Sequence, residues 1–204
     1  PQADAVTVLS EEMKKAAVDL GCPEEKIRIV RLSRDLEQFP FEVPTREVRR
    51  LLFVGRLTPK KAPLDALRAL EQANNKGAGL QLHIVGDGEL RDEVERYVEE
   101  RGLHDDVVIH GREPSEKVAE HMQAADAFVL PSKVAPDRDR EGTHTLLVEA
   151  QAKGLPCIST HHAGIPEMIP EENHDLLVQE GDVDALANKF LRVSTLPEER
   201  LRRI

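Results

Sequence analysis

The chain has 204 residues, and its 28 Lys and Arg residues against 38 Asp and Glu residues give a formal charge of −10 at pH 7. This balance excludes a general nucleic-acid binder, because affinity for a phosphate backbone requires a basic surface. No apolar run reaches membrane-spanning length, no signal peptide precedes the first strand, and the two cysteines, Cys22 and Cys157, form no disulfide framework, so a cytoplasmic protein is expected.

The N-terminal part contains two short strand patterns and one helix. Val6–Leu9 and Ile27–Val30 are short apolar runs that predict strands, and Ser10 is placed to cap the helix that follows it. Residues 31–46 are polar and contain two prolines, which is typical of a linker.

A more regular pattern begins at Arg50, where short apolar runs alternate with helical segments of about ten residues. The expected strands are 51–54, 80–85, 107–109, 127–130 and 156–159. The expected helices are 62–73, 89–101, 115–124 and 183–192, with one more around Glu149; Ser115 and Asp182 are the expected caps. This alternation predicts an α/β fold with a doubly wound parallel sheet covered on both faces.

In such sheets, ligands bind beyond the carboxyl ends of the strands. The candidate site therefore consists of the residues that follow each strand. They are Gly55-Arg56, Gly86-Asp87-Gly88, Gly111-Arg112, Pro131-Ser132 and Thr160-His161. Glycine recurs at these exits, as expected where a backbone turns tightly or approaches a ligand closely.

The segment EGTHTLLVE, from Glu141 to Glu149, carries the strongest functional signal. Glu141 is expected in a loop, and Glu149 about two turns into a helix that ends at a Lys, Gly and Pro. The helix N-terminus suits a phosphate because its N–H groups are unpaired, and a carboxylate suits sugar hydroxyl groups. The segment predicts a site for a nucleotide that carries a sugar.

Two cations follow the first strand of this pattern. Arg56 and Lys61 could neutralise a diphosphate and stabilise it as a leaving group. The alternative is that both residues face water.

The acidic residues have alternatives too. Glu149 could pair on the helix surface with Lys153, an interaction worth about 0.2–0.5 kcal/mol. Glu141 could be a favourable charge at the helix N-terminus. His144 is a candidate acid or ligand, or a histidine at the solvent edge.

No metal site is expected. His161 and His162 are neighbours in an extended segment, so their side chains should point in opposite directions, and no second cluster has metal-ligand spacing. Asp137 and Asp139 are expected in a solvated charged loop.

The order of the motifs gives a family resemblance. GRLTPKK, HIVGDGEL, IHGREP, ADAFVLPS, EGTHTLLVEA, GLPCISTHHAGIPEMI and LLVQEGD follow one another over residues 50–192. In this order and spacing they resemble the family 4 glycosyltransferases of the GT-B fold, and the long loop before the first Glu resembles enzymes of bacterial exopolysaccharide or colanic-acid-type synthesis. The fold implied is the Rossmann-like C-terminal domain of that family.

The resemblance implies a role for each matched position. Arg56 and Lys61 would hold the donor diphosphate, Glu149 would bind the nucleotide ribose, and Glu141 would face the donor sugar and the reacting centre. The remaining contacts would come from Gly142, Thr143, His144 and Thr145 to sugar and phosphate, and from Gly111 and Arg112 to the base. The catalytic set is Glu141, Lys61 and Arg56. His144 departs from the family, where a smaller residue is usual, and this leaves the sugar preference open.

The resemblance also implies the domains and the reaction. Residues 1–39 would be a remnant of an N-terminal acceptor domain with the interdomain crossing, residues 40–49 a linker, and residues 50–204 the nucleotide-sugar donor domain. The enzyme would transfer a sugar, with retention, from a nucleotide diphosphate sugar to a glycan or lipid-linked acceptor, with no cofactor and no metal. Peripheral membrane association of the full-length enzyme is left open.

Alternatives to this function are a nucleotide-sugar epimerase of GT-B fold, a non-catalytic nucleotide-sugar binding module, and a plain doubly wound domain. With most of the N-terminal domain missing, we expect this chain to bind the donor but transfer no sugar. We also expect the strand at Val6 to lack its sheet, and so to be poorly ordered, docked irregularly or paired with another chain.

Overall fold

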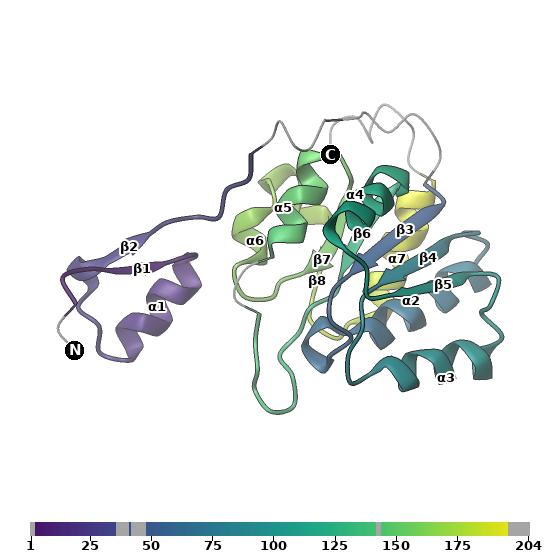
Figure 1. Cartoon of the computed structure of the whole chain (residues 1–204), viewed down its shortest axis with the longest axis horizontal. Helices are drawn as coiled ribbons and strands as arrows, with labels where there is room; N and C mark the ends of the chain where they lie inside the picture. Colours follow the sequence, from purple (N-terminus) through teal and green to yellow (C-terminus); the bar gives the residue numbers. More distant parts are fainter. Residues whose placement is uncertain (1–2, 36–40, 42–47, 142–143, 196–204) are drawn as a thin grey trace.

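The computed structural model describes residues 3–35, 41, 48–141 and 144–195, which form a six-stranded sheet and a small unit of two strands and a helix (Figure 1). The strands are β1 (Val6–Val8), β2 (Ile27–Ile29), β3 (Arg50–Val54), β4 (Gln81–Val85), β5 (Val107–Gly111), β6 (Ala127–Leu130), β7 (Cys157–Thr160) and β8 (Leu177–Val178). The α-helices are α1 (Glu11–Asp19), α2 (Pro63–Asn75), α3 (Arg91–Arg101), α4 (Ser115–Ala124), α5 (Thr145–Ala152), α6 (Ile165–Met168) and α7 (Val183–Ser194), and the 3-10 helices are η1 (Glu24–Lys26), η3 (Pro59–Lys61) and η4 (Glu171–Leu176).

The large sheet is parallel throughout, with the strand order β5-β4-β3-β6-β7-β8. The chain starts in the middle at β3, moves outward to β5, and then returns to build the other half from β6. This confirms the predicted doubly wound α/β fold. The order reverses between β3 and β6, and a crevice for ligands is expected outside the carboxyl ends of these two strands.

Both faces of the sheet are covered by helices. Leu51 and Phe53 of β3 belong to a core shared with α2, α3 and α7, while Leu52 and Val54 belong to a core shared with α4, α5 and α6 (Figure 1). Because strand residues alternate between faces, a strand covered on both sides must be apolar throughout. This is why the run at β3 could be recognised as a buried parallel strand.

Two glycines are required where the exits of β3 and β4 meet. Gly86 has a φ of 144°, and a Cβ there would lie 1.8 Å from the carbonyl oxygen of Gly55. A Cβ on Gly88 would lie 2.5 Å from the carbonyl oxygen of Leu57. These glycines allow two loops to pack backbone against backbone, so their role is structural.

Most of the predicted elements from Arg50 onward are confirmed, with small shifts at their ends. The Ser10 and Asp182 side chains accept hydrogen bonds from backbone N–H groups of α1 and α7, as expected of caps. The prediction for Ser115 was wrong: Ser115 is the first residue of α4, Pro114 precedes it, and the cap has no side-chain hydrogen bond. The short α6 and β8 were not predicted.

Cys22 and Cys157 form no disulfide bond with each other. Cys157 is buried in β7, where burial raises the pKa of its thiol, as expected of a structural residue. Cys22 is half-buried.

In the N-terminal unit, the strand at Val6 has a partner strand, although it was expected to lack its sheet. β1 pairs in parallel with β2, with Val6 opposite Ile27, because α1 supplies the crossover that two parallel strands need. The prediction of a strand without a partner in its own chain was therefore wrong. Within residues 3–35, the buried apolar side chains are Val8 and Ile27, so this unit has only a minimal core. The predicted linker, residues 40–49, lies mostly outside the described residues.

Candidate functional site

The candidate site lies at the carboxyl ends of β3 and β6, where the strand order reverses. The exit of β3 leads into η3, which carries Lys60 and Lys61. The exit of β6 leads into the loop that carries Glu141. The two exits are joined by a hydrogen bond from the backbone N–H of Lys133 to the carbonyl oxygen of Lys60, 2.9 Å long. The sheet topology therefore brings together residues that are far apart in the sequence.

Lys61 and Glu141 form an ion pair at the centre of this site. The Lys61 Nζ atom lies 3.1 Å from Glu141 Oε2, and the side chains are only 13% and 10% exposed. Burial lowers the pKa of Lys61, while the Glu141 carboxylate acts to raise it. Lys60 adds a second positive charge, with its Nζ atom 3.8 Å from Glu141 Oε1. The site thus holds two cations and one carboxylate in a water-poor environment.

His144 lies directly beside this pair. It precedes α5 and is 3% exposed, so the prediction of a histidine at the solvent edge was wrong. Burial, and next the charge of Lys61, lower the pKa of His144 to about 3. The neutral ring accepts a hydrogen bond at Nδ1 from Lys61 Nζ, 3.4 Å away, so its proton is on Nε2. Nε2 has no hydrogen-bond partner among the described residues and is a donor available to a ligand oxygen.

The low pKa of His144 predicts a loss of stability in acid. An unfolded histidine binds a proton near about pH 6.5, whereas folded His144 stays neutral down to about pH 3, so protons favour the unfolded chain between these values. The free energy of unfolding should fall by about 1.5 kcal/mol more in the wild type than in His144→Gln between about pH 6.5 and about pH 5. Urea unfolding followed by circular dichroism measures this; equal pH slopes for the two proteins would contradict it.

His162 and Glu180 hold the loop that carries Glu141. The His162 Nε2 atom accepts a hydrogen bond of 3.2 Å from the backbone N–H of Glu141, so its proton is on Nδ1. Nδ1 donates to Glu180 Oε1 at 2.7 Å, and Glu180 Oε2 accepts from the Val134 N–H at 2.8 Å. His162 is 1% exposed while its neighbour His161 is exposed, as predicted for an extended pair. This chain of bonds fixes both ends of the loop.

Glu149 faces a separate cavity of about 630 Å³. Its carboxylate accepts a hydrogen bond of 2.8 Å from Arg34 Nε, and the Glu149 side chain is 15% exposed. Lys153 is buried at the end of α5, and no described ion pair joins it to Glu149. Glu149 lies just over one turn into α5, one turn earlier than predicted. The cavity is also lined by Arg34, Glu113, Ser115, Glu116, Val118, Ala119, Met122, Thr145 and Leu146.

The other predicted residues are spread around this centre. Arg56 lines a neighbouring cavity of about 340 Å³ and is close enough to Lys61 for its charge to lower the pKa of Lys61. Thr145 lines the Glu149 cavity, and Gly111 ends β5 near it, but Arg112 is exposed and its neighbour Glu113 lines the cavity instead. Gly142 and Thr143 lie outside the described residues.

Sequence reasoning missed several residues of the site. Lys60, Arg34, Glu113, His162 and Glu180 all contact or line it. The only available signal was position: Lys60 and His162 follow strands, and Glu113 follows the Gly111 exit. Glu180 lies in the motif LLVQEGD and follows β8, a strand that was not predicted, while Arg34 had no such signal.

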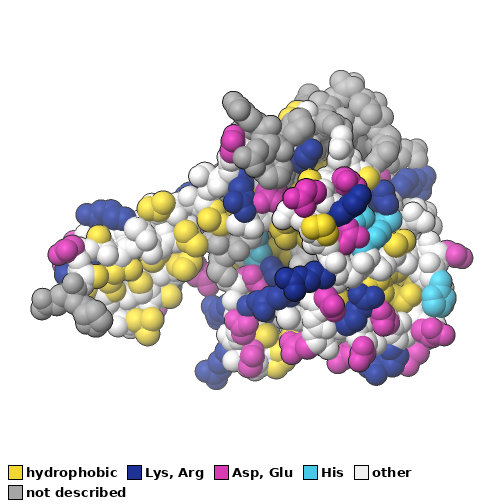
Figure 2. Space-filling model, viewed as in Figure 1, with side chains coloured by type: hydrophobic (Ala, Val, Ile, Leu, Met, Phe, Trp, Pro, Cys, Tyr) yellow, Lys and Arg dark blue, Asp and Glu magenta, His cyan; other side chains and the backbone are white. Residues whose placement is uncertain are grey.

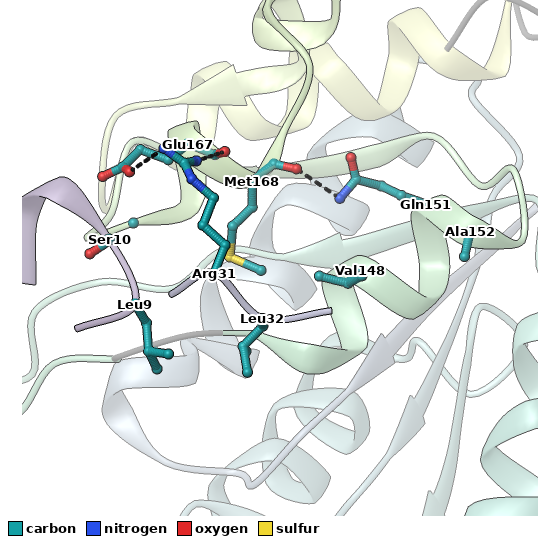
Figure 3. A pocket seen from close by; sticks show the side chains of 10 residues that line it. Leu9, Ser10, Arg31, Leu32, Val148, Gln151, Ala152, Glu167 and Met168 are labelled. Atoms are coloured by element: carbon teal, nitrogen blue, oxygen red, sulfur yellow. Dashed lines mark hydrogen bonds and ion pairs between the residues drawn. The ribbon is translucent and has the colours of Figure 1, made fainter. Parts of the chain in front are cut away.

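A third cavity, of about 430 Å³, lies between the N-terminal unit and the helices α5 and α6 (Figure 3). Glu167 connects the two sides. Its carboxylate accepts hydrogen bonds of 2.9–3.0 Å from the Glu11 N–H at the start of α1, and Arg31 lies 3.4 Å from it. A carboxylate is stabilised at a helix N-terminus by the unpaired N–H groups. Leu9 and Leu32 supply apolar lining opposite Val148 and Met168 (Figure 3).

Among the described residues, none of the helices has the length and apolar character needed to cross a lipid bilayer.

The geometry can be compared with known proteins. Residues 35–204 match the family model described as "Glycosyl transferases group 1". The chain belongs to this glycosyltransferase family. The cluster of Lys61, Glu141 and His144 therefore lies at the strand exits of a glycosyltransferase domain.

Two curated relatives of this glycosyltransferase chain are named for polysaccharide biosynthesis. It is 34% identical over 195 residues to the amylovoran biosynthesis glycosyltransferase AmsK of Erwinia amylovora, covering 95% of this chain and 48% of the relative. It is 35% identical over 185 residues to a putative colanic acid biosynthesis glycosyltransferase, WcaL, of Escherichia coli (strain K12), covering 89% of this chain and 45% of the relative. The chain spans about half the length of the curated relatives it matches.

Solved structures agree on the fold. Anabaena Alr3699/HepE, in complex with UDP and glucose, aligns with a TM-score of 0.83 at 20% identity, covering 98% of this chain and 56% of that chain. A TarM mutant of S. aureus, in a complex that includes UDP, aligns with a TM-score of 0.79 at 17% identity, covering 98% and 40%. At such low identity the similarity establishes the fold, which is that of a GT-B glycosyltransferase domain.

Proposed function

We propose that the chain is the donor-binding part of a retaining, family 4 glycosyltransferase. The enzyme transfers a sugar from a nucleotide diphosphate sugar to a glycan or lipid-linked acceptor in bacterial exopolysaccharide synthesis. The family match supports glycosyl transfer, and the names of the relatives from Erwinia and Escherichia support the polysaccharide. The order of the sequence motifs supports family 4 and retention.

The observation that carries this proposal is the buried cluster of Lys61, Glu141 and His144. A leaving diphosphate needs positive charge, which Lys61 supplies with help from Arg56 and Lys60, so the proposed transfer requires no metal. The anomeric carbon becomes positively charged as its bond to the diphosphate breaks, and the Glu141 carboxylate is placed to stabilise that charge. His144 Nε2 donates to a sugar hydroxyl or a phosphate oxygen, which gives its unpaired N–H a partner.

The cavity beside Glu149 takes the nucleoside in this proposal. A carboxylate can accept hydrogen bonds from both hydroxyl groups of a ribose, and Glu149 lies at the border between the cavity and the N-terminal part of α5. Arg34 now pairs with this carboxylate. The ribose would therefore share Glu149 with Arg34 or take its place.

The acceptor binds on the side of the N-terminal unit in this proposal. The cavity lined by Leu9, Arg31 and Met168 lies between that unit and the donor domain (Figure 3). A relative from Escherichia coli, 32% identical over 144 residues, is named as a galactosyltransferase acting on a diphosphoundecaprenol substrate, and this supports a lipid-linked acceptor. Transfer requires donor and acceptor to be held together. Positioning of this kind lowers the barrier by on the order of 7–11 kcal/mol in well-oriented reactions.

Calorimetry with a panel of nucleotide diphosphates and their sugars tests the donor site. We expect one nucleotide diphosphate to bind with clearly higher affinity than its nucleoside. Product analysis with the whole protein then separates the reactions: a glycosylated acceptor supports transfer, whereas an isomerised sugar supports an epimerase. Failure of the whole panel to bind would contradict the donor site.

Glu149→Gln should weaken the binding of every nucleotide by about the same factor, whatever sugar the nucleotide carries. The loss of two charge-assisted hydrogen bonds to the ribose corresponds to about 10–100-fold in affinity, since each bond to a charged group contributes about 1.5–3 kcal/mol and the amide keeps part of it. Calorimetry with a nucleotide diphosphate, its sugar and the free nucleoside measures this.

Glu100→Gln is the matched control, because Glu100 is exposed on α3 and is not among the residues that line the Glu149 cavity. A 2′-deoxynucleotide should show little further loss in Glu149→Gln. If the deoxynucleotide loses as much affinity as the ribonucleotide, Glu149 does not bind the ribose.

A further inference from the structure

Three histidines from different elements meet on the side of the sheet covered by α4. They are His83 of β4, His110 of β5 and His121 of α4, and one ring nitrogen of each lies within 4.8 Å of the others. His83 is buried, while the side chains of His110 and His121 are 20% and 15% exposed. None of the three belongs to the Lys61 and Glu141 cluster.

The hydrogen bonds of these rings define where the lone pairs are. Arg50 Nη2 lies 3.1 Å from His83 Nδ1, and a guanidinium group only donates, so His83 Nδ1 is an acceptor. His110 Nε2 lies 2.9 Å from the same atom and must carry a proton. In the neutral ring, His110 Nδ1 then holds a lone pair.

This lone pair faces a carboxylate. His110 Nδ1 lies 3.9 Å from Glu113 Oε1, and Glu113 Oε2 lies 3.1 Å from His121 Nε2. An imidazole lone pair beside a carboxylate is an electron-rich arrangement that a cation would stabilise. Three imidazole groups and one carboxylate are also a ligand set that zinc uses in proteins.

We propose that His83, His110 and His121, together with Glu113, bind one divalent transition-metal ion, with Zn²⁺ as the best match. The separations allow it, because small rotations of the partly exposed His110 and His121 side chains bring nitrogen atoms to about 2.0–2.1 Å from a common centre. The ion takes the place of the Arg50 guanidinium at His83 Nδ1. Histidine side chains reach the surface beside α4 in Figure 2, among acidic and basic groups, so an ion can enter from solvent.

The site has a structural consequence for the donor cavity. Glu113 lines the cavity that Glu149 faces, and it lies in the segment between β5 and α4. An ion bound to Glu113 and His110 fixes this segment, which forms one wall of the cavity. The ion is thus a support for the wall and takes no part in sugar transfer. Without an ion, hydrogen bonds join Arg50 to His83 and His83 to His110, and a separate hydrogen bond joins His121 to Glu113.

Cobalt titration tests the site directly. The chain is prepared without a histidine tag, treated with a chelator, and titrated with Co²⁺ while the visible absorption is recorded. We expect one equivalent to give the intense bands of four-coordinate Co²⁺, and one equivalent of Zn²⁺ to remove them. Zinc should also raise the unfolding temperature of the wild type, because an ion that binds only the folded chain stabilises it.

Three test variants and two control variants give the test its specificity. His121→Ala and His110→Gln should weaken Co²⁺ binding by about tenfold or more, and Arg50→Gln should strengthen it because a competing cation is removed. His104→Gln and His161→Gln are matched controls, because both histidines are exposed and lie outside the cluster.

Circular dichroism shows that each variant is folded before it is titrated. The proposal is overturned if the folded wild type shows only the spectrum of hydrated Co²⁺. It is equally overturned if binding survives in His121→Ala and His110→Gln, or if binding is lost in the His104 or His161 control.

Discussion

Glu141→Gln in the whole protein should lower kcat by about 10²–10³-fold, because removing one preorganised group that stabilises transition-state charge has an effect of this size. The affinity for the nucleotide diphosphate should change by only a few fold. Gln keeps the shape of the side chain and can still contact Lys61, but it has no negative charge to oppose the charge on the anomeric carbon. Steady-state kinetics with saturating donor, together with calorimetry, separate the two effects.

Asp139→Asn is the matched control for this prediction. Asp139 lies in the same loop and its carboxylate pairs at 2.7 Å with Lys60, whose Nζ atom also lies 3.8 Å from Glu141 Oε1, but the Asp139 side chain is 53% exposed whereas that of Glu141 is 10% exposed. An equal fall in kcat for both variants would mean that the charge of the loop matters and that Glu141 has no individual role. Unchanged turnover in Glu141→Gln would refute the role outright.

The fold was largely predictable because its signals are local. Strands buried on both faces are continuous apolar runs, and β3 is an example, since Leu51 and Leu52 must both be apolar although they face different helices. The strand exits then follow from topology, whereas the family resemblance was what placed Lys61 and Glu141 in one catalytic set although 80 positions separate their numbers. The prediction failed for α6 and β8, because elements of four and two residues are too short to give a recognisable sequence pattern.

The contacts within the site could not be predicted, because they depend on the exact packing of distant segments. Arg34 reaches Glu149 across 115 positions of sequence, and the sequence pattern favoured the nearer Lys153. The contact between Lys61 and His144 joins residues 83 positions apart, and no local pattern encodes it. His83 and His110 are 27 positions apart, on neighbouring strands, so their meeting depends on the register between β4 and β5.

Lys61→Ala should weaken binding of the nucleotide diphosphate by about 10–100-fold, while the affinity for the nucleoside changes little. A hydrogen bond to a charged group contributes about 1.5–3 kcal/mol, and only the diphosphate offers such a partner to Lys61. Arg56→Ala should show the same selectivity with a smaller effect, because Arg56 lines the neighbouring cavity. Calorimetry with both ligands on each variant measures the ratio of the affinities for the nucleotide diphosphate and the nucleoside. Lys76→Ala is the control, because Lys76 is exposed and follows α2.

Stability has to be separated from binding in this experiment, because Lys61→Ala leaves Glu141 buried without its closest cation. Breaking a buried pair by removing one partner costs about 3–5 kcal/mol in other proteins, although Lys60 reduces the effect here. The double variant Lys61→Met with Glu141→Gln removes both charges and should recover most of the lost unfolding free energy. It should not recover diphosphate affinity, since the cation is still missing. Recovery of affinity together with stability, or an equal loss for diphosphate and nucleoside in Lys61→Ala, would show that Lys61 only maintains the structure of the loop.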